Sequence, residues 1–133
     1  MISQKQILIV EDNPEILNYL SDELGKTYNV WEAKHGGEAL EVIKEQEIDL
    51  ILTDVMMPVM SGIDATKAIR SLNRPDAKTL PIIAMTANAF YEDAQKCLAA
   101  GMNAHLAKPL QIKKVKQTIA EWVKNNRSAK KDA

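Results

Sequence analysis

Short apolar runs alternate with amphipathic segments along the whole chain. The run over residues 7–10 is continuously apolar, which is typical of a strand buried on both faces. Further strands are predicted at residues 28–33, 49–53, 81–86 and 104–107. After each strand, apolar residues recur at spacings of one, three and four, which predicts a helix with one buried face. The pattern therefore predicts five strand–helix units.

Polar and small residues mark where these elements begin and end. Asn13 followed by Pro14 is a good start for the first helix, as cap and first helical residue. Gly25 is predicted to end that helix in the left-handed conformation. His35, next to two glycines, is predicted to lie in a turn. The fifth helix has its apolar stripe over residues 112–123.

Strict alternation of strands and helices predicts an α/β domain with a parallel sheet and helices on both faces. Right-handed crossovers restrict the topology further. Residues 7–10 and 49–53 are the most continuously apolar strands, so they should lie in the middle. The predicted architecture is thus a flavodoxin-like, five-stranded parallel sheet of order 2-1-3-4-5 with five helices.

Composition narrows the classes of function. The chain has 133 residues and a formal net charge of −1, which does not support a large basic surface for nucleic acid. Its one cysteine cannot form an internal disulfide or a multi-cysteine zinc site. No apolar run is long enough to span a membrane. We expect a cytoplasmic protein with one domain over residues 1–124 and a polar, basic, disordered tail over residues 125–133.

Charged and hydroxyl side chains follow the predicted strands. Glu11 and Asp12 come after the first strand, Asp54 after the third, Thr86 ends the fourth and Lys108 follows the fifth. In an open parallel sheet these carboxyl ends meet at the crevice where strand order reverses. Three carboxylates remain ionised together only beside a cation, and oxygen ligands suit Mg²⁺. A lysine and a hydroxyl beside such an ion indicate a site for a phosphoryl group, with a carboxylate as a possible nucleophile.

These residues and their context resemble the receiver domain of two-component response regulators. The resemblance extends over about residues 6–124, and its motifs form a highly specific set. The matching segments are residues 7–13, 49–58, 60–62, 81–87 and 108–109. The stretches over 85–89 and 101–104 are most similar to receivers of hybrid histidine kinases.

The resemblance implies a role for each matching residue. Asp54 is the implied phosphoacceptor, and Lys108 the implied phosphate-binding lysine. Glu11 and Asp12, together with Asp54 and the backbone carbonyl of Met56, are the implied Mg²⁺ ligands.

Two further implied features concern conformational switching. Thr86 is the implied switch hydroxyl, which moves onto the phosphoryl group. His105 stands where the family usually has a switch tyrosine or phenylalanine, so it is either a switch residue or a surface residue of the edge strand. The Lys108–Pro109 bond is a candidate for a cis peptide.

The resemblance implies a phosphoprotein of phosphorelay signal transduction. Such a domain accepts a phosphoryl group from a histidine kinase or a histidine phosphotransfer protein and then changes conformation. It is not an enzyme on other substrates, since it catalyses only its own phosphorylation and slow dephosphorylation. The face of helix 4, strand 5 and helix 5 is the implied surface for an effector or for self-association. No membrane contact is expected, and nucleic-acid contact by the basic tail is a minor alternative.

Three other functions are weaker. A phosphatase of the haloacid dehalogenase type needs a second aspartate two residues after the nucleophile, where this chain has Met56. A flavodoxin-like cofactor binder needs a phosphate cradle after the first strand, where Glu11 and Asp12 place negative charge instead. A receiver that only binds partners usually lacks part of the acidic set, whereas here the set is complete.

Overall fold

A computed structural model gives the structure of the chain and describes residues 5–54, 62–73, 77–86, 91–108 and 110–132. Within these ranges, side chains are described except at residues 62, 91–94 and 125–132. The strands are β1 (Gln6–Val10), β2 (Asn29–Ala33), β3 (Leu50–Asp54), β4 (Ile82–Thr86) and β5 (Ala104–Ala107). The helices are α1 (Pro14–Leu24), α2 (Gly36–Glu45), α3 (Gly62–Arg70), α4 (Tyr91–Ala100) and α5 (Ile112–Asp132).

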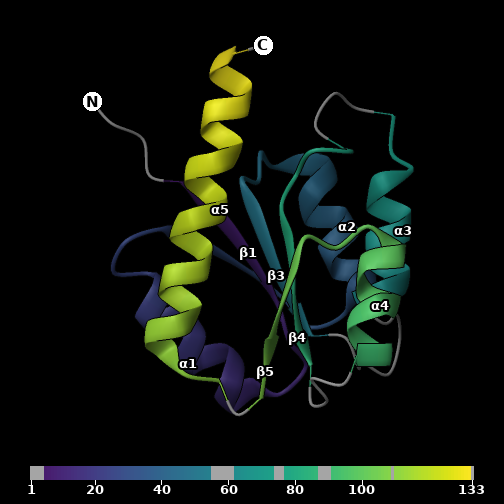
Figure 1. The fold of residues 1–133 in the computed structure, drawn as a ribbon. Helices are drawn as coiled ribbons and strands as arrows, with labels where there is room; N and C mark the ends of the chain where they lie inside the picture. The colour runs from purple at the N-terminus through teal and green to yellow at the C-terminus, as the bar shows by residue number, and fades with distance from the viewer. Residues whose placement is uncertain (1–4, 55–61, 74–76, 87–90, 109, 133) are drawn as a thin grey trace.

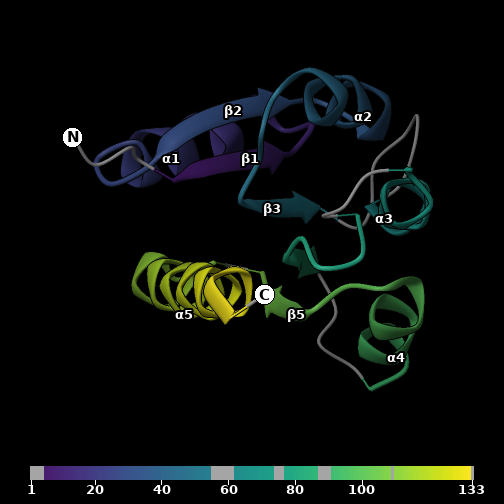
Figure 2. The same ribbon diagram turned by 90° about the horizontal axis from the view of Figure 1, so that it is seen from above.

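The five strands form one parallel sheet in the order β2-β1-β3-β4-β5. Helices α1 and α5 cover one face, and α2, α3 and α4 cover the other (Figures 1 and 2). The predicted fold class and strand order are therefore confirmed. The central position of β1 and β3 follows from their composition, since every residue of β3 is buried.

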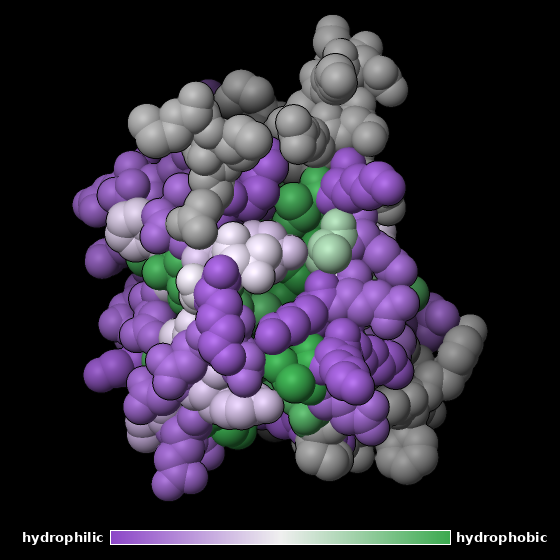
Figure 3. Space-filling model, turned by 90° about the vertical axis from the view of Figure 1, so that its left-hand side faces the viewer, coloured by the Kyte–Doolittle hydropathy of each residue, from purple (hydrophilic) through white to green (hydrophobic). Residues whose placement is uncertain are grey.

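Alternate side chains of the strands supply two cores, one on each side of the sheet. From β1, Leu8 and Val10 pack with residues of α2, α3 and α4, while Ile7 and Ile9 pack with residues of α1 and α5. On the side that carries α1 and α5, apolar patches of the surface are interrupted by polar and charged side chains (Figure 3). None of the helices in the described ranges is both long enough and apolar enough to span a membrane.

The helix starts and stops agree only in part with the sequence pattern. Asn13 caps α1 as predicted, because its Oδ1 accepts hydrogen bonds from the backbone N–H groups of Glu15 (2.9 Å) and Ile16 (3.3 Å). The prediction for Gly25 is wrong, since its φ of −64° is right-handed. Glycine is needed there for space instead: a Cβ on Gly25 would lie 2.7 Å from the backbone oxygen of Ser21.

His35 is the N-cap of α2 rather than a turn residue. Its Nδ1 accepts hydrogen bonds from the backbone N–H groups of Gly37 (3.1 Å) and Glu38 (3.3 Å). A histidine can replace the usual serine, asparagine or aspartate cap because a neutral imidazole has one acceptor nitrogen. The carboxylate of Glu38 in turn accepts from the N–H of Lys34, at 2.8 Å. Histidine is uncommon as a cap, so the turn prediction missed it.

Helix α5 continues to Asp132, whereas the sequence pattern predicted its end near residue 124 and a separate tail. The apolar stripe does end there, but nothing after it terminates a helix. Residues 112–132 contain no glycine or proline and are rich in lysine, a good helix-forming residue.

Candidate functional site

The candidate residues lie at the carboxyl ends of four neighbouring strands. Asp54 is the last residue of β3 and Thr86 the last of β4, while Glu11 follows β1 and Lys108 follows β5. The parallel register aligns these ends, since Val10 pairs with Thr53 and Thr86 with Ala107. The site is therefore built at the point where strand order reverses, between β1 and β3.

Three carboxylates converge at this edge. Glu11, Asp12 and Asp54 each place one oxygen within 4.8 Å of the other two. Glu11 is fully buried and Asp54 is 5% exposed, whereas Asp12 is open to solvent. Two of the three negative charges are thus removed from water, and the third provides a route into the cluster.

Lys108 partly neutralises this cluster. Its Nζ donates to Oε1 of Glu11 at 3.2 Å and to Oδ2 of Asp54 at 3.1 Å. The lysine side chain is 25% exposed, so it is only partly removed from solvent. The ammonium is shared between two acids, which leaves negative charge in excess in the site.

The excess of negative charge shifts the pKa values of Glu11 and Lys108. Burial, together with a hydrogen bond to Asp54 and repulsion from its charge, raises the pKa of Glu11 to about 7 despite the attraction of Lys108. Burial alone would lower the pKa of Lys108, but its hydrogen bonds and attraction to Asp54 and Glu11 outweigh burial and raise it. The lysine therefore stays charged at neutral pH, while the pKa of Glu11 lies close to neutral pH.

Backbone hydrogen bonds fix the residues of the site. The N–H of Glu11 donates to the carbonyl of Ala33 in β2 (3.0 Å), and the N–H of Lys108 donates to the carbonyl of Thr86 (2.8 Å). Oε2 of Glu11 also accepts from the N–H of Asn13, at 3.4 Å. The same asparagine caps α1, so the start of this helix is joined to the acidic cluster.

The donor set fits a hard divalent cation. All three groups are carboxylates, and the part of the chain that the structure describes brings no imidazole or thiolate into this cluster. Such oxygen ligands suit Mg²⁺, and the excess negative charge would be relieved by it. The predicted Met56 carbonyl ligand and the Lys108–Pro109 peptide bond involve residues outside the described ranges.

The two candidate switch residues are in different environments. Thr86 is 6% exposed and lies at the same edge as Asp54. His105 is exposed on β5, opposite Ala84 of β4. The structure thus places Thr86 at the site and leaves His105 on the outer strand.

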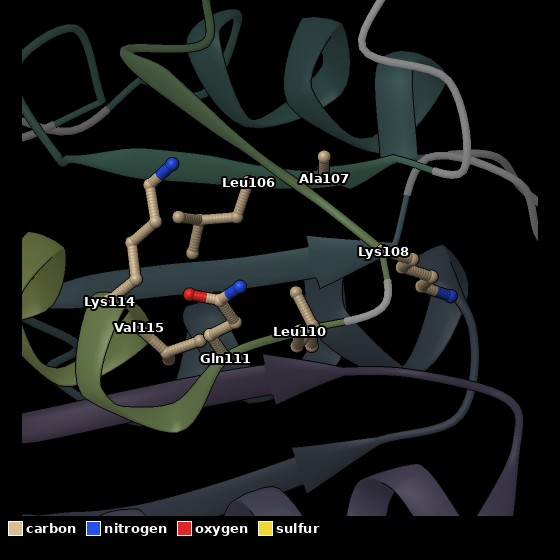
Figure 4. A pocket seen from close by; sticks show the side chains of 7 residues that line it. All are labelled: Leu106, Ala107, Lys108, Leu110, Gln111, Lys114 and Val115. Atoms are coloured by element: carbon tan, nitrogen blue, oxygen red, sulfur yellow. The ribbon is translucent and has the colours of Figure 1, made fainter.

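Lys108 also borders two hollows of the surface. One, of about 230 Å³, lies between β5 and the start of α5, and the Lys108 side chain points away from Gln111 and Lys114 there (Figure 4). The other, of about 220 Å³, is lined by Ile16, Tyr19 and Leu20 of α1 with Lys108 and Leu110. The sequence pattern did not predict this second, apolar hollow, which the half-exposed Tyr19 helps to line.

Comparison with known proteins places this geometry in a family. Residues 7–120 match the response regulator receiver domain. The chain belongs to that family. It is 41% identical over 127 residues to the sensor histidine kinase RcsC of Escherichia coli K12; the match covers 92% of this chain but 13% of RcsC. The receiver domain described here therefore corresponds to a small part of that kinase.

Two solved receiver domains are informative. That of the sensor histidine kinase PA1611 from Pseudomonas aeruginosa is 36% identical, with a TM-score of 0.82, and covers 92% of this chain and 98% of its own. It was crystallised with a magnesium ion coordinated in its active-site cleft. The receiver domain of Ssk1 from Saccharomyces cerevisiae, in complex with the histidine phosphotransfer protein Ypd1, is 32% identical with a TM-score of 0.81, covering 92% and 91%.

Proposed function

We propose that this receiver domain accepts a phosphoryl group on Asp54 from a phosphohistidine of a kinase or phosphotransfer protein. The observation that carries the proposal is the buried Asp54 carboxylate with the Lys108 ammonium at 3.1 Å and two further carboxylates beside it. A nucleophilic carboxylate, a cation for the phosphoryl oxygens and a set of metal ligands are the parts that this transfer needs. The complex of the Ssk1 receiver with Ypd1 supports a donor of this class.

The transfer is an in-line displacement at phosphorus. A carboxylate oxygen of Asp54 forms a bond to phosphorus while the bond from phosphorus to the histidine nitrogen breaks. The electron pair of the broken bond stays on the imidazole, and the product is an acyl phosphate on Asp54. Lys108 stabilises the charge on the phosphoryl oxygens, for which it must release part of its present contact with Asp54. Water later hydrolyses the acyl phosphate and restores the carboxylate, so the domain turns over only its own phosphate.

Mg²⁺ is the proposed cofactor. Glu11, Asp12 and Asp54 would hold it, with the Met56 carbonyl as a further ligand. When bound, the ion supplies positive charge that offsets both the carboxylates and the incoming phosphoryl group. The magnesium ion in the PA1611 receiver supports this assignment.

Thr86 and His105 are the proposed switch residues. The buried hydroxyl of Thr86 lies at the edge that carries Asp54, so it can turn toward a phosphoryl group there. Movement of Thr86 would leave space into which the His105 ring could rotate from its exposed position. NMR spectra of His105, with and without beryllofluoride as a phosphoryl analogue, test this, because unchanged ring shifts would rule the rotation out. His105→Tyr is expected to keep the switch.

The remaining assignments follow from this function. We assign the receiver domain to residues 1–124. We propose that it functions in the cytoplasm, where phosphohistidine donors would act on it. An effector, or a second copy of the chain, would bind the face formed by α4, β5 and α5. The basic residues after 124 extend α5 and have no assigned partner.

Intact-mass spectrometry after treatment with acetyl phosphate and Mg²⁺ tests the proposal. The wild-type domain is expected to gain one phosphoryl group, and Asp54→Asn none. Asp49→Asn is a matched control, because Asp49 precedes the same strand at the opposite end of the sheet and accepts the Gln6 N–H at 2.7 Å. Equal labelling of Asp54→Asn and wild type would contradict the assignment, whereas loss of labelling in both variants would show a general effect of charge.

A further inference from the structure

The guanidinium of Arg70 joins three segments at the end of the sheet opposite to the acidic site. Arg70 is the last residue of α3, which lies beside α4 (Figures 1 and 2). Its Nε and Nη2 donate to the carbonyl of Gly101, at 3.1 and 2.7 Å. Nη1 donates to the carbonyls of Leu80 (2.7 Å) and Ala77 (3.1 Å), and Nη2 also donates to Oδ1 of Asn103 (2.9 Å). All five N–H groups of the side chain can be used in this way.

The turn after α4 is shaped to receive this side chain. Gly101 has a φ of +108°, and the N–H groups of Gly101 and Met102 donate back to the carbonyls of Leu98 and Cys97, both at 3.0 Å. These two bonds are those of a helix that ends at a left-handed glycine. The carbonyl of Gly101 itself accepts from Arg70. A Cβ on Gly101 would lie 3.1 Å from Cγ of Arg70. The glycine therefore provides both the backbone conformation and the space for Arg70.

Asn103 connects the arginine to the sheet. Its Oδ1 accepts from Arg70 and also from the N–H of Ile82, at 2.9 Å, and its own N–H donates to the carbonyl of Ile82 at 2.8 Å. Asn103 thus pairs with the first residue of β4 immediately before the regular pairing of Ile83 with Ala104 begins. These contacts lie immediately outside the strand, at the point where the pairing of β5 with β4 begins.

The strand itself specifies this alignment only weakly. β5 has four residues, and within the described ranges it pairs with β4 alone. Leu106 is its one buried side chain, while His105 and Ala107 are exposed. A slip of one residue would turn every side chain to the other face, and a short edge strand with a single buried side chain resists such a slip poorly.

Lys108 depends on that alignment. It follows β5 directly, and its N–H continues the pairing by donating to the carbonyl of Thr86 at 2.8 Å. Its ammonium reaches Asp54 and Glu11 only if β5 keeps this register. The arginine contacts lie about 17 Å away along the strand, at about 3.3 Å per residue, so no direct contact with the site is involved.

We propose that Arg70, acting through Gly101 and Asn103, is a positioning residue that holds Lys108 at the acidic site by setting the register of β5. The consequence for phosphorylation rests on the proposed function. The consequence for the alignment of β5 does not depend on that function.

Variants that remove the hydrogen bonds of the Arg70 guanidinium, or the Asn103 acceptor, test the proposal. Arg70→Lys keeps the charge but not the planar arrangement of donors, and Asn103→Ala removes the shared acceptor. Both are expected to slow phosphorylation by acetyl phosphate between about tenfold and a hundredfold, the size of effect expected when a site residue moves by about 1 Å. Asn103→Asp keeps an acceptor for both partners and is expected to retain the wild-type rate.

Amide hydrogen exchange at Lys108 is the second readout, since it measures the bond to Thr86 without any phosphorylation. It should become faster in Arg70→Lys and Asn103→Ala and remain slow in Asn103→Asp. Ile43→Val, which changes a buried core residue of α2, is the control for loss of stability away from β5. All rates are compared at a temperature where each variant is fully folded, and Asn103→Ala carries the test if Arg70→Lys does not fold.

The outcomes separate this inference from the proposed function. If wild type takes no phosphoryl group, the proposed function fails and hydrogen exchange alone decides the register. Wild-type exchange at Lys108 in the folded Asn103→Ala variant would overturn the inference. An equal acceleration of exchange in Ile43→Val would also overturn it, because the effect would then be one of general stability.

Discussion

Binding of Mg²⁺ to this domain should release a proton near neutral pH, and Glu11 should supply it. The pKa of Glu11 is raised to about 7 in the metal-free fold, because the carboxylate is buried and lies beside Asp54. A cation among the three carboxylates favours the charged form of each. A proton held by Glu11 must therefore leave when the metal binds.

The size of the effect follows from this pKa. At pH 6.5 a group with a pKa of about 7 is about three-quarters protonated, and at pH 8.5 it is protonated in about 3% of molecules. Each Mg²⁺ should thus displace about three-quarters of a proton at pH 6.5 and almost none at pH 8.5. The affinity for Mg²⁺ should rise about fourfold over the same interval, because the competing proton is lost.

The same group makes the stability of the metal-free domain depend on pH. Because the pKa of Glu11 is higher in the folded state, the folded domain keeps its proton between about pH 4.5 and 7, where the unfolded chain has lost it. The stabilisation of the folded state by the protonated Glu11 is complete below pH 4.5 and is lost as pH rises through about 7. A difference of about 2.5 pKa units corresponds to about 3 kcal/mol in the free energy of unfolding. Mg²⁺ should therefore stabilise the domain most at high pH.

Isothermal titration calorimetry with Mg²⁺ in two buffers of different ionisation enthalpy measures the released protons. The difference in apparent binding enthalpy should be large at pH 6.5 and close to zero at pH 8.5. Glu11→Gln has no titrating group at this position, so its binding enthalpy should be the same in both buffers at either pH. Equal proton release by wild type and Glu11→Gln would refute the assignment to Glu11, and no release at pH 6.5 would refute the raised pKa.

Two further predictions concern the ends of helices. His35→Ala should lower the free energy of unfolding by about 1 kcal/mol in urea denaturation at pH 8, because the backbone N–H groups of Gly37 and Glu38 lose their acceptor. His35→Asn keeps an acceptor and should retain most of the wild-type stability. Equal stability of the two variants would argue against the cap. Gly25→Ala restricts the unfolded chain, which by itself would stabilise the fold. Its Cβ would lie 2.7 Å from the Ser21 oxygen, so we expect a net loss of about 1 kcal/mol, and a gain would show that the backbone relaxes easily.

The order of strands and the convergence of the acidic residues could be predicted because both depend on periodic, local patterns. Continuous apolar runs place β1 and β3 in the middle of the sheet, and a residue that follows a parallel strand must lie at its carboxyl edge. Glu11, Asp54 and Lys108 are therefore neighbours, although they are far apart in the chain. The family resemblance assigned roles to these positions, and those roles remain proposals.

The helix ends were predicted less well. A glycine after a helix usually indicates the left-handed conformation, but Gly25 is there because the Ser21 carbonyl lies too close for any side chain. The helical continuation of α5 past residue 124 was missed because the prediction followed the apolar stripe, whereas the residues after the stripe contain no glycine or proline that would end the helix.

The distances between charged groups are decided by the tertiary structure and cannot be read from the sequence pattern. The sequence pattern shows that Lys108 follows β5. Whether its ammonium reaches Glu11 and Asp54 depends on the pairing of β5 with β4, which we propose is held at its start by Arg70 and Asn103. The pKa of Glu11 depends on burial and on the separation from Asp54, which a linear pattern does not contain. Hydrophobic periodicity is local and determines which face of each element is buried, and hence the fold. Electrostatic energies depend on separation and solvent access in three dimensions, so only the folded chain decides the chemistry of the site.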